Sequence, residues 1–374
     1  MTPLVSFAER RVIIMYNIMD LFAGVGGLSY GFSILDEFNI VAANEIEKDI
    51  SIAYSLNHPE VNMLNCDIKD LTEDMIKEAT KGQKIDIIVG GPPCQSYSTV
   101  GKRQMDDRAN LFLEYKRILE IVQPKAFIFE NVVGILSMDK GKLFQRVQSA
   151  FEELGYTLKY KVLDAVNYGV PQHRERVILV GFKGDNNFSY PEETHGENDP
   201  NKLPWITYGE ALCDLPSLKS GQEDNRYVDE PLNDFLRFVR KDGTTIANEH
   251  KAPKNGAHLI RIMEALEEGQ SKDDLPEDIR PKSGYGNTYA KLWWDRPSTT
   301  ITRNFACPSS SRCVHPRDSR AMSIREGARL QSFPDDYKFY GSEGMKRLEI
   351  GNAVPPLLSV AIAQEMLKAM KNTK

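Results

Sequence analysis

Three features are missing from this 374-residue sequence, and each absence excludes a class of protein. The longest apolar run of the N-terminal segment, residues 12–16, is too short for a signal-peptide core or a membrane span. The five cysteines, at positions 66, 94, 213, 307 and 313, neither pair evenly nor form a CxxC knuckle. A secreted disulfide scaffold is therefore excluded, and we expect a cytoplasmic protein that makes no contact with a membrane.

The third missing feature is an excess of positive charge. The net charge is −6, so the protein as a whole would not attract nucleic acid. The charge is nevertheless uneven, because residues 296–330 hold seven arginines, at 296, 303, 312, 317, 320, 325 and 329, against two acids. This stretch predicts either a local basic face that binds phosphate or a solvated charged surface. The histidines at 250, 258 and 315 lack the spacing of metal ligands, and we expect no bound metal.

The sequence does contain the alternation that is typical of a parallel α/β sheet. Its composition, 41% hydrophobic and 27% charged, is that of an ordinary globular protein, and its length suggests about two domains. Strand-like apolar runs occur at 12–22, 40–43, 85–89, 126–129 and 177–182, and helical spacing occurs at 28–35, 111–122 and 143–154. This order favours βαβ units and a mostly parallel, doubly wound sheet.

The character of the chain changes after residue 183. Residues 184–295 are rich in Asn, Asp, Glu, Pro and Gly, whereas 322–330 and 354–370 again show helical spacing. We therefore predict a larger α/β domain over 12–183 and a smaller, irregular domain over 184–335. The C-terminal segment, 336–374, is predicted to return to the larger domain.

The most informative stretch is GGPPCQS at residues 90–96, directly after the apolar run 85–89. Two glycines and two prolines end the strand abruptly and form a stiff turn. The turn places Cys94 at the carboxyl end of a strand, where open α/β sheets bind their ligands. A thiol there is a candidate nucleophile, although a buried cysteine can also serve as a small hydrophobic side chain.

A glycine-rich turn, DLFAGVGGL at residues 20–28, joins the first strand to the first helix. Its glycines let the backbone approach a nucleotide closely, but Ser29 replaces the third glycine of the dinucleotide fingerprint, which disfavours NAD. Glu45, about 20 residues further on, is suited to ribose hydroxyls, and Asp67 could accept from an adenine amino group. Each of these two acids could equally be an exposed acid at a strand end.

Together these motifs resemble the DNA cytosine-5 methyltransferases of the bacterial modification type. The matching blocks occur in the family's order over nearly the whole chain: DLFAGVGGL at 20–28, NE at 44–45, DI at 67–68, GPPCQ at 91–95, FENV at 129–132, QHRER at 172–176, RPSTT at 296–300 and GNAVP at 351–355. Each block is only moderately specific, but their order is very specific. One departure is Ile46, where family members often carry a bulkier side chain.

The resemblance implies a Rossmann-like methyltransferase fold with S-adenosylmethionine as the methyl donor and S-adenosylhomocysteine as the product. Residues 12–183 would be the catalytic domain, and 184–335 the target-recognition domain, with its sequence-reading residues within 184–295. The residues expected to line the cofactor site are Phe22, Gly24, Gly26, Glu45, Ile46, Asp67, Ile68, Leu111, Asn352 and Val354.

The resemblance also implies that the target cytosine is flipped out of duplex DNA and attacked at C6 by the Cys94 thiolate. Glu130 would meet N3 of the base, and Arg174 and Arg176 would stabilise developing charge, unless these arginines are plain phosphate contacts or surface pairs. Residues 96–104 are expected to form a lid over the site. The residues expected to contact DNA are Ser96, Lys102, Arg103, Gln172, Arg296, Thr299 and Arg303, with the three histidines at the surface or against DNA.

We therefore expect a monomeric, sequence-specific DNA methyltransferase that acts on double-stranded DNA. A cognate restriction endonuclease would act on the same site without binding the enzyme. The alternative within the same chemistry is a tRNA cytosine-5 methyltransferase, which would lack so large a recognition region. A catalytically silent DNA-binding module is disfavoured by the intact Cys94 and Glu130, and a small-molecule methyltransferase would have no use for the recognition region.

Overall fold

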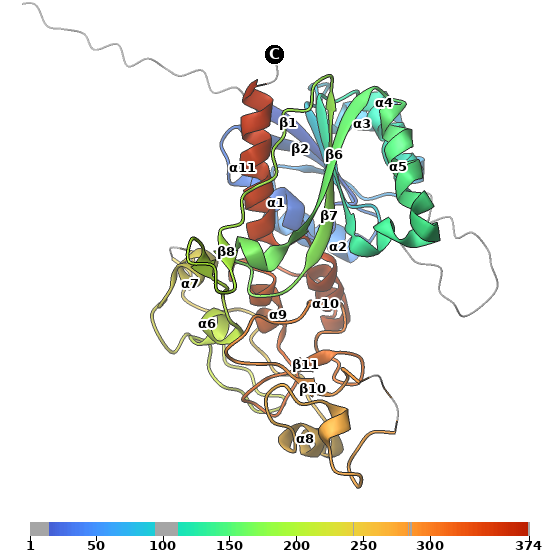
Figure 1. The fold of residues 1–374 in the computed structure, drawn as a ribbon. Helices are drawn as coiled ribbons and strands as arrows, with labels where there is room; N and C mark the ends of the chain where they lie inside the picture. The colour runs from blue at the N-terminus through green and yellow to red at the C-terminus, as the bar shows by residue number, and fades with distance from the viewer. Residues whose placement is uncertain (1–14, 94–110, 242, 283, 285, 373–374) are drawn as a thin grey trace, which may run out of the picture.

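The structure, a computed structural model, describes residues 15–93, 111–241, 243–282, 284 and 286–372. Its larger part is an α/β body around a seven-stranded sheet, and its smaller part is an irregular body of short helices and loops (Figure 1). The strands of the sheet are β1 (Tyr16–Leu21), β2 (Phe38–Asn44), β3 (Asn62–Leu64), β4 (Ile87–Gly90), β5 (Ala126–Val132), β6 (Tyr156–Asp164) and β7 (Glu175–Lys183). Their order across the sheet is β3-β2-β1-β4-β5-β7-β6.

The predicted mostly parallel sheet is confirmed, and its one reversed strand is β7. Strands β1 to β5 pair in parallel, whereas β7 lies antiparallel to both of its neighbours, β5 and β6. The short connection between β6 and β7 suits an antiparallel pair, because a parallel crossover needs a dozen residues or more. The apolar run at 177–182 predicted this strand but carried no information on its direction.

Alternate side chains of each strand point to opposite faces of the sheet, and each face is covered by helices. Tyr16 and Ile18 pack with α1 (Gly27–Ser33) and the C-terminal helix α11 (Pro356–Asn372), whose side chains belong to the same apolar cluster. Met19 and Leu21 face the other cluster, formed with α3 (Glu73–Ala79), α4 (Leu111–Val122) and α5 (Lys142–Glu152). Figure 1 shows α11 and α5 on opposite sides of the sheet. Helix α2 (Lys48–Asn57) lies between β2 and β3 in the chain.

The C-terminal helix is tied directly to the first helix. The Ser359 hydroxyl donates to the carbonyl oxygen of Leu28, and the backbone of Ser359 lies so close to Gly31 that a Cβ there would collide with it. In the described part of the chain, no helix is both long enough and apolar enough to cross a membrane.

The smaller part holds short elements around a core that continues into the larger part. Val25 and Tyr30, beside the glycine turn, pack in the same apolar cluster as Phe305, Leu330 and Ile350. The strands and α-helices between β7 and α11 are β8 (His195–Gly196), β9 (Leu203–Pro204), α6 (Tyr208–Leu212), α7 (Asp234–Val239), α8 (Ala257–Glu264), β10 (Ala290–Lys291), β11 (Arg312–Val314), α9 (Ile324–Leu330) and α10 (Glu343–Asn352). The two parts therefore share one apolar contact region.

The arginine-rich stretch 296–330, for which the composition predicted either a basic face or a solvated charged surface, is partly buried. Arg325 and Arg329 are fully buried, and Arg329 donates to both carboxylates of Asp214 and Asp335. Arg325 adds an ion pair with Asp335 at 3.5 Å. A count of charges along the chain could not reveal this, because Asp214 is far from these arginines in sequence.

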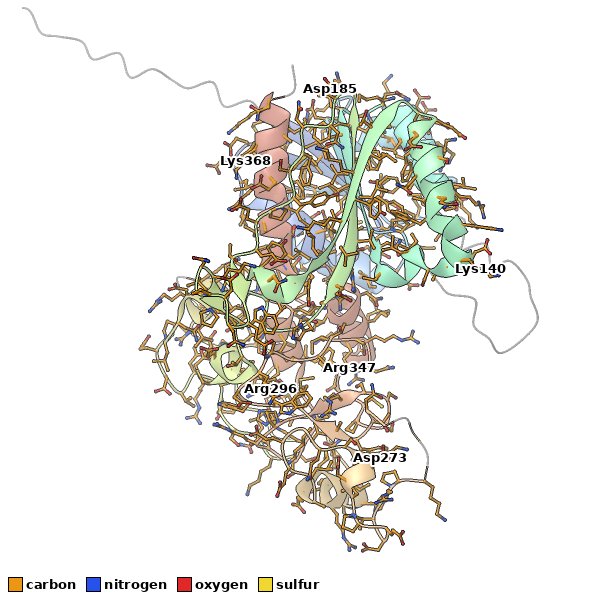
Figure 2. All side chains as sticks on the ribbon, in the orientation of Figure 1. Lys140, Asp185, Asp273, Arg296, Arg347 and Lys368 are labelled. Carbon is orange, nitrogen blue, oxygen red and sulfur yellow. The ribbon has the colours of Figure 1, made fainter. Side chains whose placement is uncertain are left out.

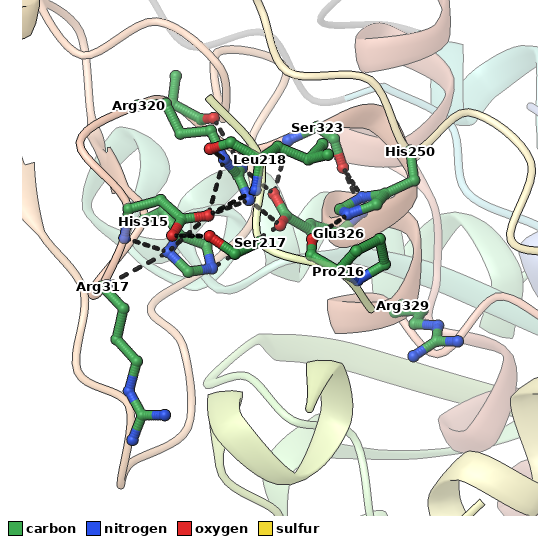
Figure 3. A network of polar contacts seen from close by, with 12 residues as sticks. Pro216, Ser217, Leu218, His250, His315, Arg317, Arg320, Ser323, Glu326 and Arg329 are labelled. Atoms are coloured by element: carbon green, nitrogen blue, oxygen red, sulfur yellow. Dashed lines mark hydrogen bonds and ion pairs between the residues drawn. The ribbon is translucent and has the colours of Figure 1, made fainter. Parts of the chain in front are cut away.

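A second buried network surrounds Arg320, as Figure 3 shows. Its guanidinium binds the two carboxylate oxygens of Glu326 at 2.8 and 2.7 Å. The side chain of His250 contacts the Ser323 hydroxyl at 3.0 Å and the Pro216 carbonyl at 2.9 Å. The expectation that His250 and His315 lie at the surface or against DNA is therefore wrong, since both are buried and their ring nitrogens have partners inside the smaller part.

A third buried group lies at the end of β1, beneath the glycine turn. The Ser29 hydroxyl donates to the Asp20 carboxylate at 2.5 Å and lies 2.8 Å from the Tyr54 hydroxyl. Burial raises the pKa of Asp20 to about 7, outweighing the hydrogen bond from Ser29 that lowers it. Asp20 therefore binds a proton more strongly in the folded protein than in the unfolded chain.

The first prediction concerns the buried arginines. Arg329→Met leaves the Asp214 and Asp335 carboxylates buried without their main partner, so we expect the protein to lose about 3–5 kcal/mol of unfolding free energy. Urea unfolding followed by the fluorescence of Trp205, Trp293 and Trp294 measures this. The matched control is Arg237→Met, which removes an exposed pair and should leave the midpoint nearly unchanged. Equal midpoints for the two variants would contradict the stabilising role of the buried network.

The second prediction concerns Asp20 and pH. Since its pKa is raised from 3.8 to about 7, the stability that protonated Asp20 contributes is full below pH 4 and is lost as pH rises through 7. The wild type should therefore lose stability relative to Asp20→Asn between pH 5 and pH 8, as measured by urea unfolding at each pH. Asp36→Asn, which removes an exposed charge, is the control. Parallel pH profiles for the wild type and Asp20→Asn would contradict the prediction.

Candidate active site

The candidate site lies along one edge of the sheet, where the carboxyl ends of β1 to β5 meet. Because β7 is reversed, its amino-terminal start lies at the same edge, and Arg176 pairs in register with Val132. Arg176 Nε lies 2.7 Å from Glu130 Oε1. The structure therefore brings together two predicted catalytic side chains that are 46 residues apart in sequence.

Glu130 and Arg176 form a nearly buried ion pair, each side chain being 11% exposed. Burial raises the pKa of Glu130, and this effect exceeds the lowering by the guanidiniums of Arg176 and Arg174. Such a carboxyl group can hold a proton at a higher pH than an exposed glutamate. The sequence placed Glu130 just beyond its strand, whereas β5 continues to Val132 and holds this side chain within the ladder.

The turn that follows β4 packs directly against Glu130. A Cβ on Gly91 would lie 2.5 Å from Glu130 Oε2, so only glycine leaves room for this carboxylate. Asn131 Nδ2 donates to the Pro92 carbonyl at 3.0 Å and holds the turn from the neighbouring strand. The turn leads toward Cys94. Four predicted site residues lie outside the described part of the chain: Cys94, Ser96, Lys102 and Arg103.

The glycine turn after β1 has the open backbone that a bound nucleotide requires. Phe22, Gly24 and Gly26 all have positive φ, at 55°, 56° and 95°. A Cβ on Gly24 would meet nothing within 4 Å, which leaves space in front of the turn, whereas one on Gly26 would lie 2.7 Å from His58 Nε2. The turn is therefore open at Gly24 and closely packed from behind at Gly26.

Glu45 holds the glycine turn from the end of β2. Its Oε2 accepts from the Gly24 backbone N–H at 2.9 Å, and its Oε1 accepts from the Glu47 N–H at 2.9 Å. Burial raises the pKa of this carboxyl group despite these hydrogen bonds. Both carboxylate oxygens retain lone pairs that could accept from the hydroxyls of a ligand.

Four further predicted cofactor residues follow β2 and β3 or begin α4. Ile46 is 56% exposed, which is unusual for a large apolar side chain and suits a surface that a flat ring could cover. Asp67 accepts from the Lys69 N–H at 3.0 Å, and Ile68 beside it is buried. Leu111 is half-buried at the start of α4.

The last two predicted cofactor residues lie at the end of α10 and just after it. Asn352 is exposed at the end of this helix, and the carbonyl group of Val354 lies against Gly27, where a Cβ would collide with it. Together, an open glycine turn, a carboxylate at its edge and an exposed apolar side chain fit a nucleoside-containing cofactor. The described residues contain no group of three or more histidines, cysteines or acids that could hold a metal ion.

Arg174 and Gln172 are placed differently from the prediction. The Arg174 guanidinium is buried and donates to the backbone carbonyls of Ile301 and Gly351, both at 2.8 Å. Gln172 is fully buried, and its amide binds Leu330, Gln331 and Ile301. The structure therefore contradicts a direct DNA contact by Gln172, because no part of its side chain reaches the surface.

Of the other predicted DNA contacts, Arg296 and Arg303 are exposed, and Thr299 is half-buried. Arg296, labelled in Figure 2, lies on the smaller part with its guanidinium 5.7 Å from the centre of the Trp293 ring. Sequence reasoning missed Gln331, whose side chain is completely buried and joins Gln172. The available signal was a polar residue directly after Leu330 and two residues before Phe333, at the end of the predicted helical stretch 322–330.

The comparisons with known proteins agree with this arrangement. The family model of the C-5 cytosine-specific DNA methylases matches residues 16–368 of this chain. The type II methyltransferase M1.HphI of Haemophilus parahaemolyticus is 33% identical over 358 residues, which cover 95% of this chain and 87% of that protein. The type II methyltransferase M.DdeI of Desulfomicrobium norvegicum is 36% identical over 380 residues, covering 94% of this chain and 88% of that protein.

Solved structures share the fold. The S. pombe Dnmt2 methyltransferase superposes with a TM-score of 0.58 at 18% identity, covering 94% of this chain and 99% of that chain. An E. coli structure described as a prophage-encoded DNA modification methyltransferase reaches a TM-score of 0.76 at 23% identity, covering 95% of this chain and 99% of that chain. The family match over most of the chain decides the assignment: the protein is a methyltransferase and belongs to the C-5 cytosine-specific DNA methylase family.

Proposed function

We propose that this enzyme transfers a methyl group from S-adenosylmethionine to C5 of a cytosine flipped out of duplex DNA. The observation that carries the proposal is the buried Glu130–Arg176 pair, held against the Gly91 turn that leads to Cys94. A flipped base is required because C5 and C6 are inaccessible within the base stack. The names of the relatives support a modification role beside a restriction endonuclease.

In the proposed mechanism, Cys94 activates the base. C5 of cytosine is a poor nucleophile until a thiolate adds to C6, which makes C5 resemble an enamine carbon. The new S–C6 bond moves electron density to N3, where Glu130 donates a proton or a hydrogen bond. The raised pKa of Glu130 supports this role, since the carboxyl group must carry a proton to donate it.

The remaining steps restore the base. The chemistry that bound S-adenosylmethionine would supply is a methyl group activated by the sulfonium charge, with S-adenosylhomocysteine as the product. Once C5 carries the methyl group, water would accept the C5 proton, the C5–H electron pair would form the C5–C6 double bond as the Cys94 thiolate leaves C6, and a proton held at N3 would return to Glu130. Arg176 fixes the orientation of Glu130 and places positive charge beside the reacting base.

The cofactor would bind at the glycine turn. Glu45 would accept from the ribose hydroxyls, Ile46 and Ile68 would contact the adenine, and Asp67 would accept from its amino group. The exposed fraction of Ile46 and the open space at Gly24 support this assignment. Asn352 and Val354 would close the other side of the site.

DNA would lie between the active-site edge and the smaller part, with the sequence read by residues within 184–295. Exposed Arg296 and Arg303 would contact phosphates and position the duplex without reading its sequence. We propose that the protein acts as a monomer in the cytoplasm. The alternative substrate is tRNA, and a direct comparison of DNA with tRNA as methyl acceptors separates the two.

The third prediction tests the nucleophile. Cys94→Ala should reduce transfer of radiolabelled methyl groups to DNA to below a tenth of wild-type turnover, because no thiolate is left to activate C5. Binding of S-adenosylmethionine, measured by calorimetry, should be largely unchanged. Cys213→Ala, which removes a half-buried thiol elsewhere, is the matched control. A Cys94→Ala enzyme that keeps a tenth of wild-type turnover or more would overturn covalent catalysis, and transfer to tRNA alone would overturn the DNA substrate.

The fourth prediction tests the cofactor site. Glu45→Ala should weaken S-adenosylmethionine binding by about 1–3 kcal/mol, because the ribose hydroxyls lose a buried acceptor. Calorimetry measures the affinity, with the neighbouring Glu47→Ala as the control, since the Glu47 side chain is exposed. If both variants bind the cofactor as tightly as the wild type, Glu45 has no role at the ribose.

A further inference from the structure

Two buried amide side chains meet where the larger and smaller parts join. Gln172 lies just before β7, and Gln331 lies at the end of α9, 159 residues further along the chain. Gln172 Nε2 donates to Gln331 Oε1 at 2.8 Å, and neither side chain has any exposed surface. A buried amide is stabilising only when its donors and acceptors have partners. The Gln172 amide oxygen and the Gln331 amide nitrogen therefore need partners outside this pair.

The amide pair extends in both directions to backbone groups. At one end, the Ile301 N–H donates to Gln172 Oε1 at 2.9 Å. At the other end, Gln331 Nε2 donates to the Ile350 carbonyl at 2.6 Å. The two side chains thus form a relay of three hydrogen bonds between the segment that precedes Arg303 and the last turn of α10.

Arg174 joins the same two segments a second time. Its guanidinium donates to the carbonyls of Ile301 and Gly351, which are neighbours of the groups bound by the relay. The carbonyls of Ile350 and Gly351 belong to the C-terminal turn of α10, where carbonyl groups lack the usual donor four residues further on, although the first of them accepts from the Ala353 N–H at 3.3 Å. The amide of Gln331 gives that carbonyl a second donor, and the cation of Arg174 binds the other carbonyl, where a positive charge also suits the helix dipole.

Residues 351–354, at the end of α10 and just after it, lie between the predicted DNA contact Arg303 and the glycine turn. Gly351 is packed so tightly against the backbone of Thr302 and Arg303 that a Cβ at position 351 would collide with both. Three residues later, the carbonyl group of Val354 packs equally tightly against Gly27 of the glycine turn. The backbone of residues 351–354 thus packs closely against residues 302–303 at one end and against Gly27 at the other.

We propose that Gln331 is a positioning residue that couples DNA binding to cofactor binding. It fixes the end of α10, so that a shift of the backbone at 302–303 on DNA binding is carried through residues 351–354 to the glycine turn. Gln331 touches neither ligand and acts only through Ile350 and Gln172. The inference rests on the proposed function, because it assumes DNA near Arg303 and S-adenosylmethionine at Gly24.

The test measures the affinity for S-adenosylhomocysteine with and without a duplex that carries the sites methylated by the wild-type enzyme, as located by bisulfite sequencing. The wild type should bind the product at least about fivefold more tightly in the presence of the duplex, the lower end of typical coupling between sites. Gln331→Met keeps the side-chain length but removes both hydrogen bonds. This variant should lose most of the increase in affinity for S-adenosylhomocysteine that the duplex produces. Its affinity without DNA should stay within about threefold of wild type.

Two further variants separate positioning from stability. The double variant Gln172→Met/Gln331→Met removes both amides, so that no amide side chain is left without its partner. It should also lack the coupling. Asn186→Leu removes a buried amide that binds Thr157 and Val180 at a distance from this junction, and it should keep the wild-type ratio.

The outcomes distinguish the inference from the function on which it rests. A wild-type enzyme that fails to methylate any DNA would overturn the proposed function. Methylation by the wild type with no coupling, or with the same coupling in Gln331→Met and the double variant, would overturn only the positioning role of Gln331. Loss of coupling in Asn186→Leu as well would also overturn it, since general destabilisation would then explain the effect.

Discussion

The active-site edge depends on the reversal of one strand. Because β7 runs antiparallel to β5, Arg176 at its start reaches Glu130 near the end of β5, and the two form a nearly buried ion pair. The Arg176 guanidinium favours the charged form of this carboxyl group, whereas burial favours the protonated form and is the larger effect, so the pKa of Glu130 is raised. The pair therefore fixes the carboxyl group at one position, against the turn at Gly91.

Other buried arginines also have partners, both within the smaller part and where the two parts of the molecule meet. The buried guanidiniums of Arg320 and Arg329 are matched by carboxylates within the smaller part, whereas Arg174 is matched by backbone carbonyls from two other segments. The smaller part is thus ordered by ion pairs, and its junction with the larger part is ordered by hydrogen bonds to backbone. Such bonds fix the position of the backbone itself. A site that is assembled from segments far apart in the sequence requires backbone held in this way.

The sequence predicted the features that depend on local patterns. The apolar runs at 85–89 and 126–129 correspond to β4 and β5, and the helical spacing at 111–122 matches α4. It did not predict β6, whose central residues, exposed or half-buried at the edge of the sheet, give no apolar run. It also did not reveal the burial of Arg329 and Gln172. Arg329 has a near partner in Asp335, but Asp214 and the Gln331 partner of Gln172 lie more than 100 residues away in the chain. Burial of a polar side chain depends on such distant partners, and one sequence does not reveal them.

The central claim is that Cys94 forms a bond to C6 of the target cytosine. The most direct test uses duplex DNA with 5-fluorocytosine at the methylated position, since fluorine at C5 prevents the final proton loss. After incubation with S-adenosylmethionine and proteolysis, mass spectrometry should find the methylated, fluorinated base attached to the peptide that contains Cys94. Absence of any adduct, or an adduct at Cys66, Cys213 or Cys307 instead, would contradict the account.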